Sequence, residues 1–262
     1  MIKAKKSLGQ NFLIDQNVIY KIINIVDIKN RNILEIGPGT GNLTSAILNK
    51  DPKNLIVIEK DNKLSHLLKK KFRDRIKVIN EDVLEIDENL LNKETLTVFG
   101  NLPYNISTKI LSKWILNLNN KNIWFDHLVL MFQKEVADRI ISEYNCKNYG
   151  RLSILTNWKL DVKKIFDIKP SSFSPRPKIN SSVLFFKPKK DFYKLINPKS
   201  LEKITRIFFM HRRKMIRKPY YQVFKGNNSI YLKLKIDLKL RPQNLNSDTY
   251  FKLANEYEKL FG

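Results

Sequence analysis

The chain has 262 residues, of which 42% are hydrophobic and 11% aromatic, so it can bury a sizeable core, and extensive disorder is excluded. Lysine and arginine number 49 against 25 aspartate and glutamate, a formal charge of +24, which is typical of proteins that bind a polyanion such as nucleic acid. The sequence has no apolar run of membrane-spanning length, no secretory signal pattern and a single cysteine, Cys146, which excludes membrane and disulfide-rich secreted classes and predicts a cytoplasmic protein.

The first two thirds of the chain alternate short apolar runs with segments of helical spacing. Strands are predicted at 32–36, 55–59, 76–79, 96–99, 127–132 and 183–186. Helices are predicted at 42–48, 63–72, 110–118 and 134–142. Strands that alternate with helices indicate an α/β fold with a doubly wound, mostly parallel sheet and helices on both faces.

The pattern changes after the strand at 183–186, which Pro188 ends. Residues 193–261 show mostly helical spacing, and we expect two domains, 1–187 and a smaller all-α domain at 188–262. Basic residues are densest in this C-terminal part, which favours it as the surface for a polyanion. Because most of the basic residues are lysine, a compositional bias spread over solvated faces is the alternative explanation.

A glycine-rich segment, Gly37-Pro38-Gly39-Thr40-Gly41, separates the first predicted strand from a helix. Such a turn lets a ligand approach the backbone, and Glu59 ends the next strand at a spacing suited to bind a ribose diol. The segment lacks the third glycine of the dinucleotide fingerprint, and Pro38 removes an N–H group that a pyrophosphate would use. A nucleoside without a pyrophosphate, such as S-adenosylmethionine, suits it better, and an ordinary tight turn is the alternative.

The third predicted strand is followed by Glu81 and Asp82. Ligands of doubly wound sheets lie at the carboxyl ends of the strands, where an acid can accept a hydrogen bond from the amino group of an adenine. A solvated loop acid or a helix cap explains the same residues.

The most informative segment is Asn101-Leu102-Pro103-Tyr104, which directly follows the fourth predicted strand. An exocyclic amine has two hydrogens, and two carbonyl acceptors can hold both and direct the nitrogen lone pair toward a methyl donor. Asn101 offers its side-chain carbonyl and Leu102 its backbone carbonyl, while Pro103 has no N–H to repel an amine. Tyr104 offers an aromatic face to a base taken out of its stack. A proline turn that exposes an aromatic ring is the alternative.

In this order and spacing, the motifs resemble the ribosomal RNA adenine N6-dimethyltransferases that use S-adenosylmethionine, over essentially the whole chain. The resemblance adds three segments: Lys6–Leu13 as an entrance motif, Phe173–Ser181 as a second aromatic segment, and His211–Lys214 as a basic helix. Within the family the chain is more similar to the small-subunit enzymes than to the large-subunit resistance methyltransferases. Ile179 departs from the commoner valine by one methyl group.

The resemblance implies a role for each matching residue. The catalytic group is Asn101, Leu102, Pro103, Tyr104 and Phe173, the last stacking on the target adenine. The cofactor-binding group is Asn11, Leu13, Gly37, Gly39, Glu59, Asp82 and Asn101. The RNA-binding group is Arg212, Arg213, Lys214 and Arg217. Without the resemblance, the sequence favours Phe173 as a core residue. Asn11 as a helix cap and the basic run as a solvated helix face are the alternatives for the other two segments.

The function implied is N6,N6-dimethylation of two adjacent adenosines in a hairpin loop near the 3′ end of 16S rRNA, during biogenesis of the small ribosomal subunit. We expect a monomeric enzyme whose partner is small-subunit rRNA or a pre-30S particle. We expect no metal, because His66, His127 and His211 are scattered away from other ligand types. The alternatives are a large-subunit rRNA adenine methyltransferase and a non-catalytic assembly factor on the same fold.

Overall fold

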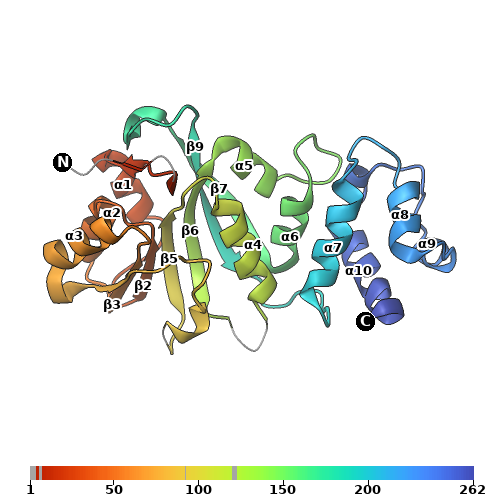
Figure 1. Cartoon of the computed structure of the whole chain (residues 1–262), viewed down its shortest axis with the longest axis horizontal. Coiled ribbons are helices and arrows are strands. Elements are labelled where there is room, and N and C mark those ends of the chain that lie inside the picture. The colour runs from red at the N-terminus through yellow and green to blue at the C-terminus, as the bar shows by residue number, and fades with distance from the viewer. Residues whose placement is uncertain (1–3, 6–7, 92, 120–122) are drawn as a thin grey trace. The chain divides into compact units, whose positions relative to one another are not determined.

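A computed structural model describes residues 4–5, 8–91, 93–119 and 123–262 (Figure 1). The chain divides into two compact units. The first comprises Met1–Lys113, Leu118–Ala137 and Val162–Pro188, and the second comprises Trp114–Asn117, Asp138–Asp161 and Lys189–Gly262. The second unit therefore takes in two segments that the sequence prediction assigned to residues 1–187, because these segments pack with the helices after 188. The functional division into domains 1–187 and 188–262 stays a prediction.

The first unit is built on a seven-stranded sheet with the order β4-β3-β2-β5-β6-β9-β7. The strands are β2 (Asn32–Ile36), β3 (Asn54–Ile58), β4 (Lys77–Ile79), β5 (Leu96–Asn101), β6 (Phe125–Gln133), β7 (Leu160–Ile168) and β9 (Ser181–Pro188). Strands β4, β3, β2, β5 and β6 pair in parallel, whereas β9 pairs antiparallel with β6. The predicted α/β class with a mostly parallel sheet is confirmed.

The central strands are buried along most of their length because helices cover the sheet. All five residues of β2 are buried, as are the first five of β5. On one face, alternate strand residues pack against the apolar sides of α1 (Gln16–Ile23), α2 (Asn42–Leu48) and α3 (Asn62–Phe72). Two further helices of this part of the chain are α4 (Ser107–Asn117) and α5 (Lys134–Ile140).

Strand register brings the motif segments together. Ile36, the last residue of β2, pairs with Ile58 of β3 on one side and with Gly100 of β5 on the other. Because all three strands run in the same direction, the glycine segment, Glu59 and Asn101 emerge at the same edge of the sheet. This edge is where parallel sheets bind ligands.

Several elements were not predicted. A two-stranded sheet joins β1 (Phe12–Leu13) antiparallel to β8 (Phe173–Ser174), and α1 begins at the N-cap Asp15. The edge strand β7 alternates exposed and half-buried residues, so it lacks the apolar run that marks the central strands.

The second unit is helical. It contains α6 (Arg151–Lys159), α7 (Pro198–Phe209), α8 (Arg217–Phe224), α9 (Ser229–Lys233) and α10 (Ser247–Phe261). Its core is aromatic, with Phe208, Tyr220, Phe224 and Tyr250 fully buried. Helix α10 packs on α7 and α6. No helix within the described residues has the length and apolar character needed to cross a membrane.

Candidate active site

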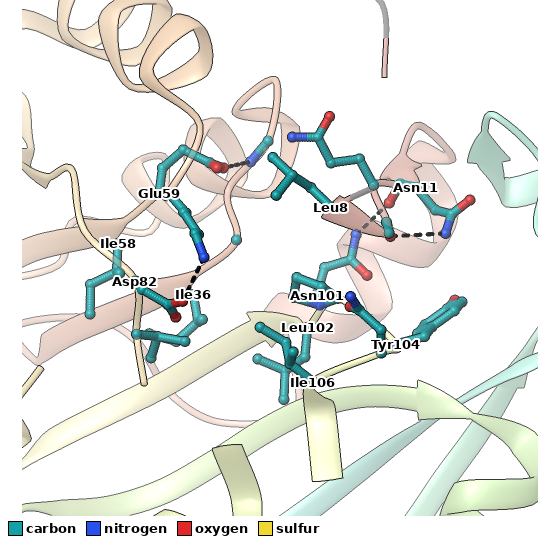
Figure 2. Close-up of a pocket in the computed structure, with 18 of the residues that line it drawn as sticks. Leu8, Asn11, Ile36, Ile58, Glu59, Asp82, Asn101, Leu102, Tyr104 and Ile106 are labelled. Atoms are coloured by element: carbon teal, nitrogen blue, oxygen red, sulfur yellow. Dashed lines mark hydrogen bonds and ion pairs between the residues drawn. The ribbon is translucent and has the colours of Figure 1, made fainter. Parts of the chain in front are cut away.

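A pocket opens at the carboxyl edge of the parallel strands, entirely within the first unit. It contains about 930 Å³ of space, part of which is open to solvent. Its walls come from Leu8–Phe12, Ile36, Gly37, Gly39, Ile58–Lys60, Glu81–Val83 and Asn101–Ile106. Figure 2 shows Glu59 and Asp82 on one side of this pocket and Asn101 with Tyr104 on the other.

The glycine segment is shaped by close packing. Gly37 and Gly39 both have positive φ angles, +67° and +57°, which favour glycine. A Cβ atom at Gly37 would lie 2.9 Å from the backbone carbonyl oxygen of Asn101, and one at Gly39 would lie 2.6 Å from the ring of Phe12. The two glycines therefore let the loop contact both the catalytic segment and the N-terminal segment, with its backbone forming part of the pocket wall.

Glu59 lies at the pocket with only 7% of its surface exposed. Its carboxylate accepts hydrogen bonds from the backbone N–H of Gly39, at 3.3 Å, and of Asp61, at 2.8 Å. Burial raises the pKa of Glu59 although these N–H groups favour its ionised form. The acid is thus fixed next to the glycine loop, where a ribose is expected.

Asp82 lines the same side of the pocket. One of its oxygens pairs with Lys60 at 2.7 Å and the other accepts from the backbone N–H of Leu84 at 3.0 Å. Partial burial opposes ionisation of Asp82, but the hydrogen bonds from Lys60 and Leu84 outweigh it, so its pKa is lowered. Asp82 is therefore an ionised acceptor at the wall.

The segment predicted to be catalytic, Asn101–Tyr104, begins at the last residue of β5. The side-chain N–H₂ group of Asn101 donates to the backbone carbonyl of Asn11, 2.8 Å away, and its side-chain oxygen lies on the side of Tyr104 (Figure 2). Leu102 is buried with its side chain under the pocket, while Tyr104 is half-buried. The Tyr104 hydroxyl is 2.5 Å from the hydroxyl of Ser181, at the start of β9. The side chains of Asn101 and Tyr104 are therefore both held by residues that are distant in sequence.

The N-terminal segment closes one side of the pocket. Lys5 forms an ion pair with Asp61 at 2.7 Å, and the Gln10 side chain donates to the same carboxylate at 3.5 Å. Asp61 is also the N-cap of α3, accepting from two backbone N–H groups there. Lys6 and Ser7 of the entrance motif lie outside the described residues.

Two predicted site residues are not at the pocket surface. Phe173 is 1% exposed and belongs to the hydrophobic core, where it pairs with Leu13 across the β1–β8 sheet. The Phe173 ring therefore packs as a core residue here, in contrast to the expected stacking on a base. Leu13 is buried in the same core. The leucine of the entrance motif that lines the pocket is Leu8.

The four predicted RNA-binding residues lie in the second unit. The prediction of a basic helix at His211–Lys214 is wrong, since these residues form a turn between α7, which ends at Phe209, and α8, which begins at Arg217. The four side chains also differ in their exposure. Arg213, Lys214 and Arg217 are exposed, whereas Arg212 is half-buried. The Arg212 guanidinium donates to the backbone carbonyls of Cys146 and Lys147. Arg212 therefore fastens the 146–147 turn, and the other three present their charge to solvent.

Within the described ranges, no three His, Cys, Asp or Glu side chains gather in a way that could hold a metal ion. The polar groups at the pocket are instead three acids, three asparagines, a glutamine, a lysine, a tyrosine and backbone groups. Such a set, together with the apolar side chains of Ile36, Ile58 and Val83, fits a nucleoside with a ribose diol.

This combination of fold and site defines a class: the S-adenosylmethionine-dependent methyltransferases with a Rossmann-like sheet, in which a glycine loop follows the first strand of the parallel sheet and an acid follows the second. The profile of the ribosomal RNA adenine dimethylase family matches residues 1–259. The chain belongs to that family.

Individual relatives agree with this membership. The chain is 65% identical over 261 residues to ribosomal RNA small subunit methyltransferase A of Pelagibacter ubique (strain HTCC1062), covering 100% of this chain and 99% of the relative. It is 40% identical to the protein of the same name from Wolbachia sp. subsp. Drosophila simulans (strain wRi), covering 100% and 96%.

Solved structures show the same fold. A dimethyladenosine transferase from Plasmodium falciparum is 28% identical with a TM-score of 0.79, covering 95% of this chain and 98% of that one. The 23S rRNA methyltransferase ErmE is similar in fold, with a TM-score of 0.67 at 19% identity over 95% of this chain and all of the other.

Sequence reasoning missed four residues that shape the site. Leu8 and Gln10 lie within the entrance motif and Ser181 ends the second aromatic segment, but none of them was given a role of its own. Asp61 was not singled out. An aspartate directly before a helix, as Asp61 is here, is a recognised N-cap signal, so the capping role of Asp61 could have been predicted. Its contacts with Lys5 and Gln10, and the contact of Ser181 with Tyr104, depend on tertiary structure.

Proposed function

We propose that this protein transfers methyl groups from S-adenosylmethionine to N6 of two adjacent adenosines in a hairpin loop near the 3′ end of small-subunit rRNA. Membership of the rRNA adenine dimethylase family supports adenine N6 as the acceptor, and the printed names of the relatives support the small subunit. The observation that carries the proposal is the fixed amide of Asn101 at the pocket that also contains Glu59 and Asp82.

The pocket residues divide the cofactor between them. Glu59 binds the ribose hydroxyls, and Asp82 accepts a hydrogen bond from the adenine amino group. Ile36, Ile58 and Val83 provide apolar contacts for the base. Gly37, Gly39 and the Asn11 segment enclose the part of the molecule that carries the methyl group.

Orientation of the acceptor amine is the main catalytic contribution of the protein. The Asn101 side-chain oxygen and the Leu102 carbonyl accept the two amine hydrogens, which directs the nitrogen lone pair away from the ring plane. Because Asn101 donates its own N–H to Asn11, its amide cannot flip, and the oxygen stays on the acceptor side. The bound cofactor supplies a methyl group on a sulfonium, which is an excellent leaving group.

Tyr104 provides the stacking surface for the extruded adenine, and the Ser181 hydroxyl holds the ring in place. No strong general base is required, since the methylated ammonium is acidic and loses its proton to water. A loop base suits this site better than a paired base because unstacking a loop base costs less.

Arg213, Lys214 and Arg217 bind RNA phosphates through their exposed charges. We also propose that the protein acts as a monomer in the cytoplasm on pre-30S particles or their rRNA.

The proposal is tested by incubating the protein with labelled S-adenosylmethionine and either unmethylated small subunits or large subunits. Label incorporated into adenosines of the small subunit alone supports the proposal. Label in the large subunit alone favours the large-subunit alternative, and binding without transfer to either favours the non-catalytic assembly factor.

A further inference from the structure

Lys113, on α4, lies among three acceptors from the segment that follows Asp82. Its ammonium donates to the Val83 backbone carbonyl at 3.3 Å, to the Ile86 backbone carbonyl, and to a Glu88 carboxylate oxygen at 2.8 Å. An ammonium has three N–H groups, and each one has an acceptor here.

The surroundings make this contact strong. The Glu88 side chain is 3% exposed and the Lys113 side chain 22%, so the ion pair is shielded from water. Breaking a shielded pair is more costly than breaking an exposed one, because a buried charge is left behind. The two backbone carbonyls further fix the direction in which residues 83–86 turn.

The same segment forms the pocket wall. Asp82 and Val83 line the pocket, and Asp82 is held by Lys60 and by the backbone N–H of Leu84. Lys60 fastens this wall to the end of β3, whereas Lys113 fastens it to α4. Helix α4 begins at Ser107, directly after the catalytic segment Asn101–Ile106, so one helix supports two sides of the site.

We propose that Lys113 is a positioning residue that sets the wall recognising the adenine of the cofactor. This inference rests on the proposed function, in which Asp82 accepts the adenine amino group. Lys113 does not line the pocket and acts through Val83 and the turn that follows Asp82. Loss of Lys113 lowers the affinity for adenosyl compounds and reduces the preference for them over analogues that lack the amino group. The oriented amide of Asn101 is untouched.

The experiment measures binding of S-adenosylhomocysteine and of its inosine analogue, which has an oxygen in place of the amino group, by calorimetry. The wild-type protein is expected to prefer the adenosyl compound by about tenfold or more, the range of one charged hydrogen bond. In Lys113→Met this preference falls to less than about threefold, with weaker binding of the adenosyl compound. Lys113→Arg keeps the positive charge but not the hydrogen-bond geometry, and its preference for the adenosyl compound is expected to lie between those of the wild type and Lys113→Met.

Lys109→Met is the matched control, since Lys109 is exposed on the same helix. The control should retain the wild-type affinities. The inference is overturned if Lys113→Met keeps both the affinity and the preference of the wild type. If Lys113→Met does not fold, the inference is overturned by a Lys113→Arg variant whose preference equals that of the wild type. A wild type that binds both compounds equally overturns the inference and the adenine-recognising role of Asp82, while the proposed methyl transfer to adenosine stands. A wild type that binds neither compound overturns the proposed function and, with it, the role of Lys113.

Discussion

The Asn101 side-chain amide donates to the Asn11 backbone carbonyl at 2.8 Å, which joins the end of β5 to a segment 90 residues earlier in the chain. An amide whose N–H₂ group is occupied in this way has its oxygen fixed in direction. In the proposed mechanism, the N-terminal segment therefore helps to orient the acceptor amine, in addition to forming a wall of the pocket.

Asn101→Ala removes an acceptor for the amine and should lower kcat by about a hundredfold or more, because positioned polar groups contribute on that scale. Affinity for S-adenosylmethionine should change far less. Asn101→Asp is the sharper variant, since it keeps an oxygen but cannot donate to Asn11, and it should also lose activity. Single-turnover methylation and calorimetry measure the two quantities separately. Equal losses of rate and affinity would argue against an orienting role.

Tyr104 and Ser181 should act as a pair, because their hydroxyls lie 2.5 Å apart. Tyr104→Phe keeps the stacking ring, and Ser181→Ala removes the hydroxyl that holds it. Each change alone should lower kcat severalfold, and the double variant should be no worse than the poorer single variant, as expected for residues in direct contact. A double-mutant cycle on kcat tests this coupling. Independent, multiplying effects would show that Ser181 does not act through Tyr104.

Glu35, buried in β2, predicts a pH dependence of stability. Burial, with a further contribution from Glu59, raises the pKa of Glu35 to about 8, and one of its oxygens has no hydrogen-bond partner among the described residues. Because the folded state keeps this proton while the unfolded state loses it near pH 4.5, the stability falls as pH rises from about 4.5 to 8. The slope contributed by this group is at most about 1.4 kcal/mol for each pH unit.

Glu35→Gln removes this titration, so the free energy of unfolding of the variant relative to wild type should increase between pH 5.5 and pH 8. Urea unfolding of the two proteins at both pH values measures the difference. A difference that is the same at both pH values would place the Glu35 pKa in the folded state below this interval, near its ordinary value.

Neutralising Arg213, Lys214 and Arg217 to glutamine should weaken RNA binding and reduce the slope of log affinity against log salt by about 2 to 3, since each phosphate contact contributes just under one. Lys252→Gln with Lys259→Gln is the control, because these lysines are already paired with Asp248 and Glu256. Binding of a small-subunit hairpin RNA at several salt concentrations provides the slopes. An unchanged slope in the triple variant would mean that these residues are simply solvated surface charges that do not bind RNA.

The sequence was most informative where a motif directly follows an apolar strand. The glycine segment, Glu59 and the Asn-Leu-Pro-Tyr segment each follow a buried apolar strand, so both the sheet and the meeting of these motifs at one edge were predictable. Strand β7 was missed because an edge strand carries Lys163 and Asp167 among its exposed positions and has no apolar run.

Long-range contacts were beyond local patterns. The residues around Phe173 favoured core packing, but its partner Leu13 lies 160 residues away and could not be predicted from local patterns. Arg212 was predicted to bind RNA because it lies in a run of basic residues. Its contacts with the backbone carbonyls of Cys146 and Lys147 depend on how the second unit folds.

The most direct test of the central claim is to map methylated adenosines by mass spectrometry after incubating the protein and S-adenosylmethionine with unmethylated small-subunit RNA or particles. The account predicts two neighbouring N6,N6-dimethyladenosines in one hairpin loop near the 3′ end, and none with Asn101→Ala. Methylation at another atom or in another RNA, or none with the wild-type protein, would contradict it.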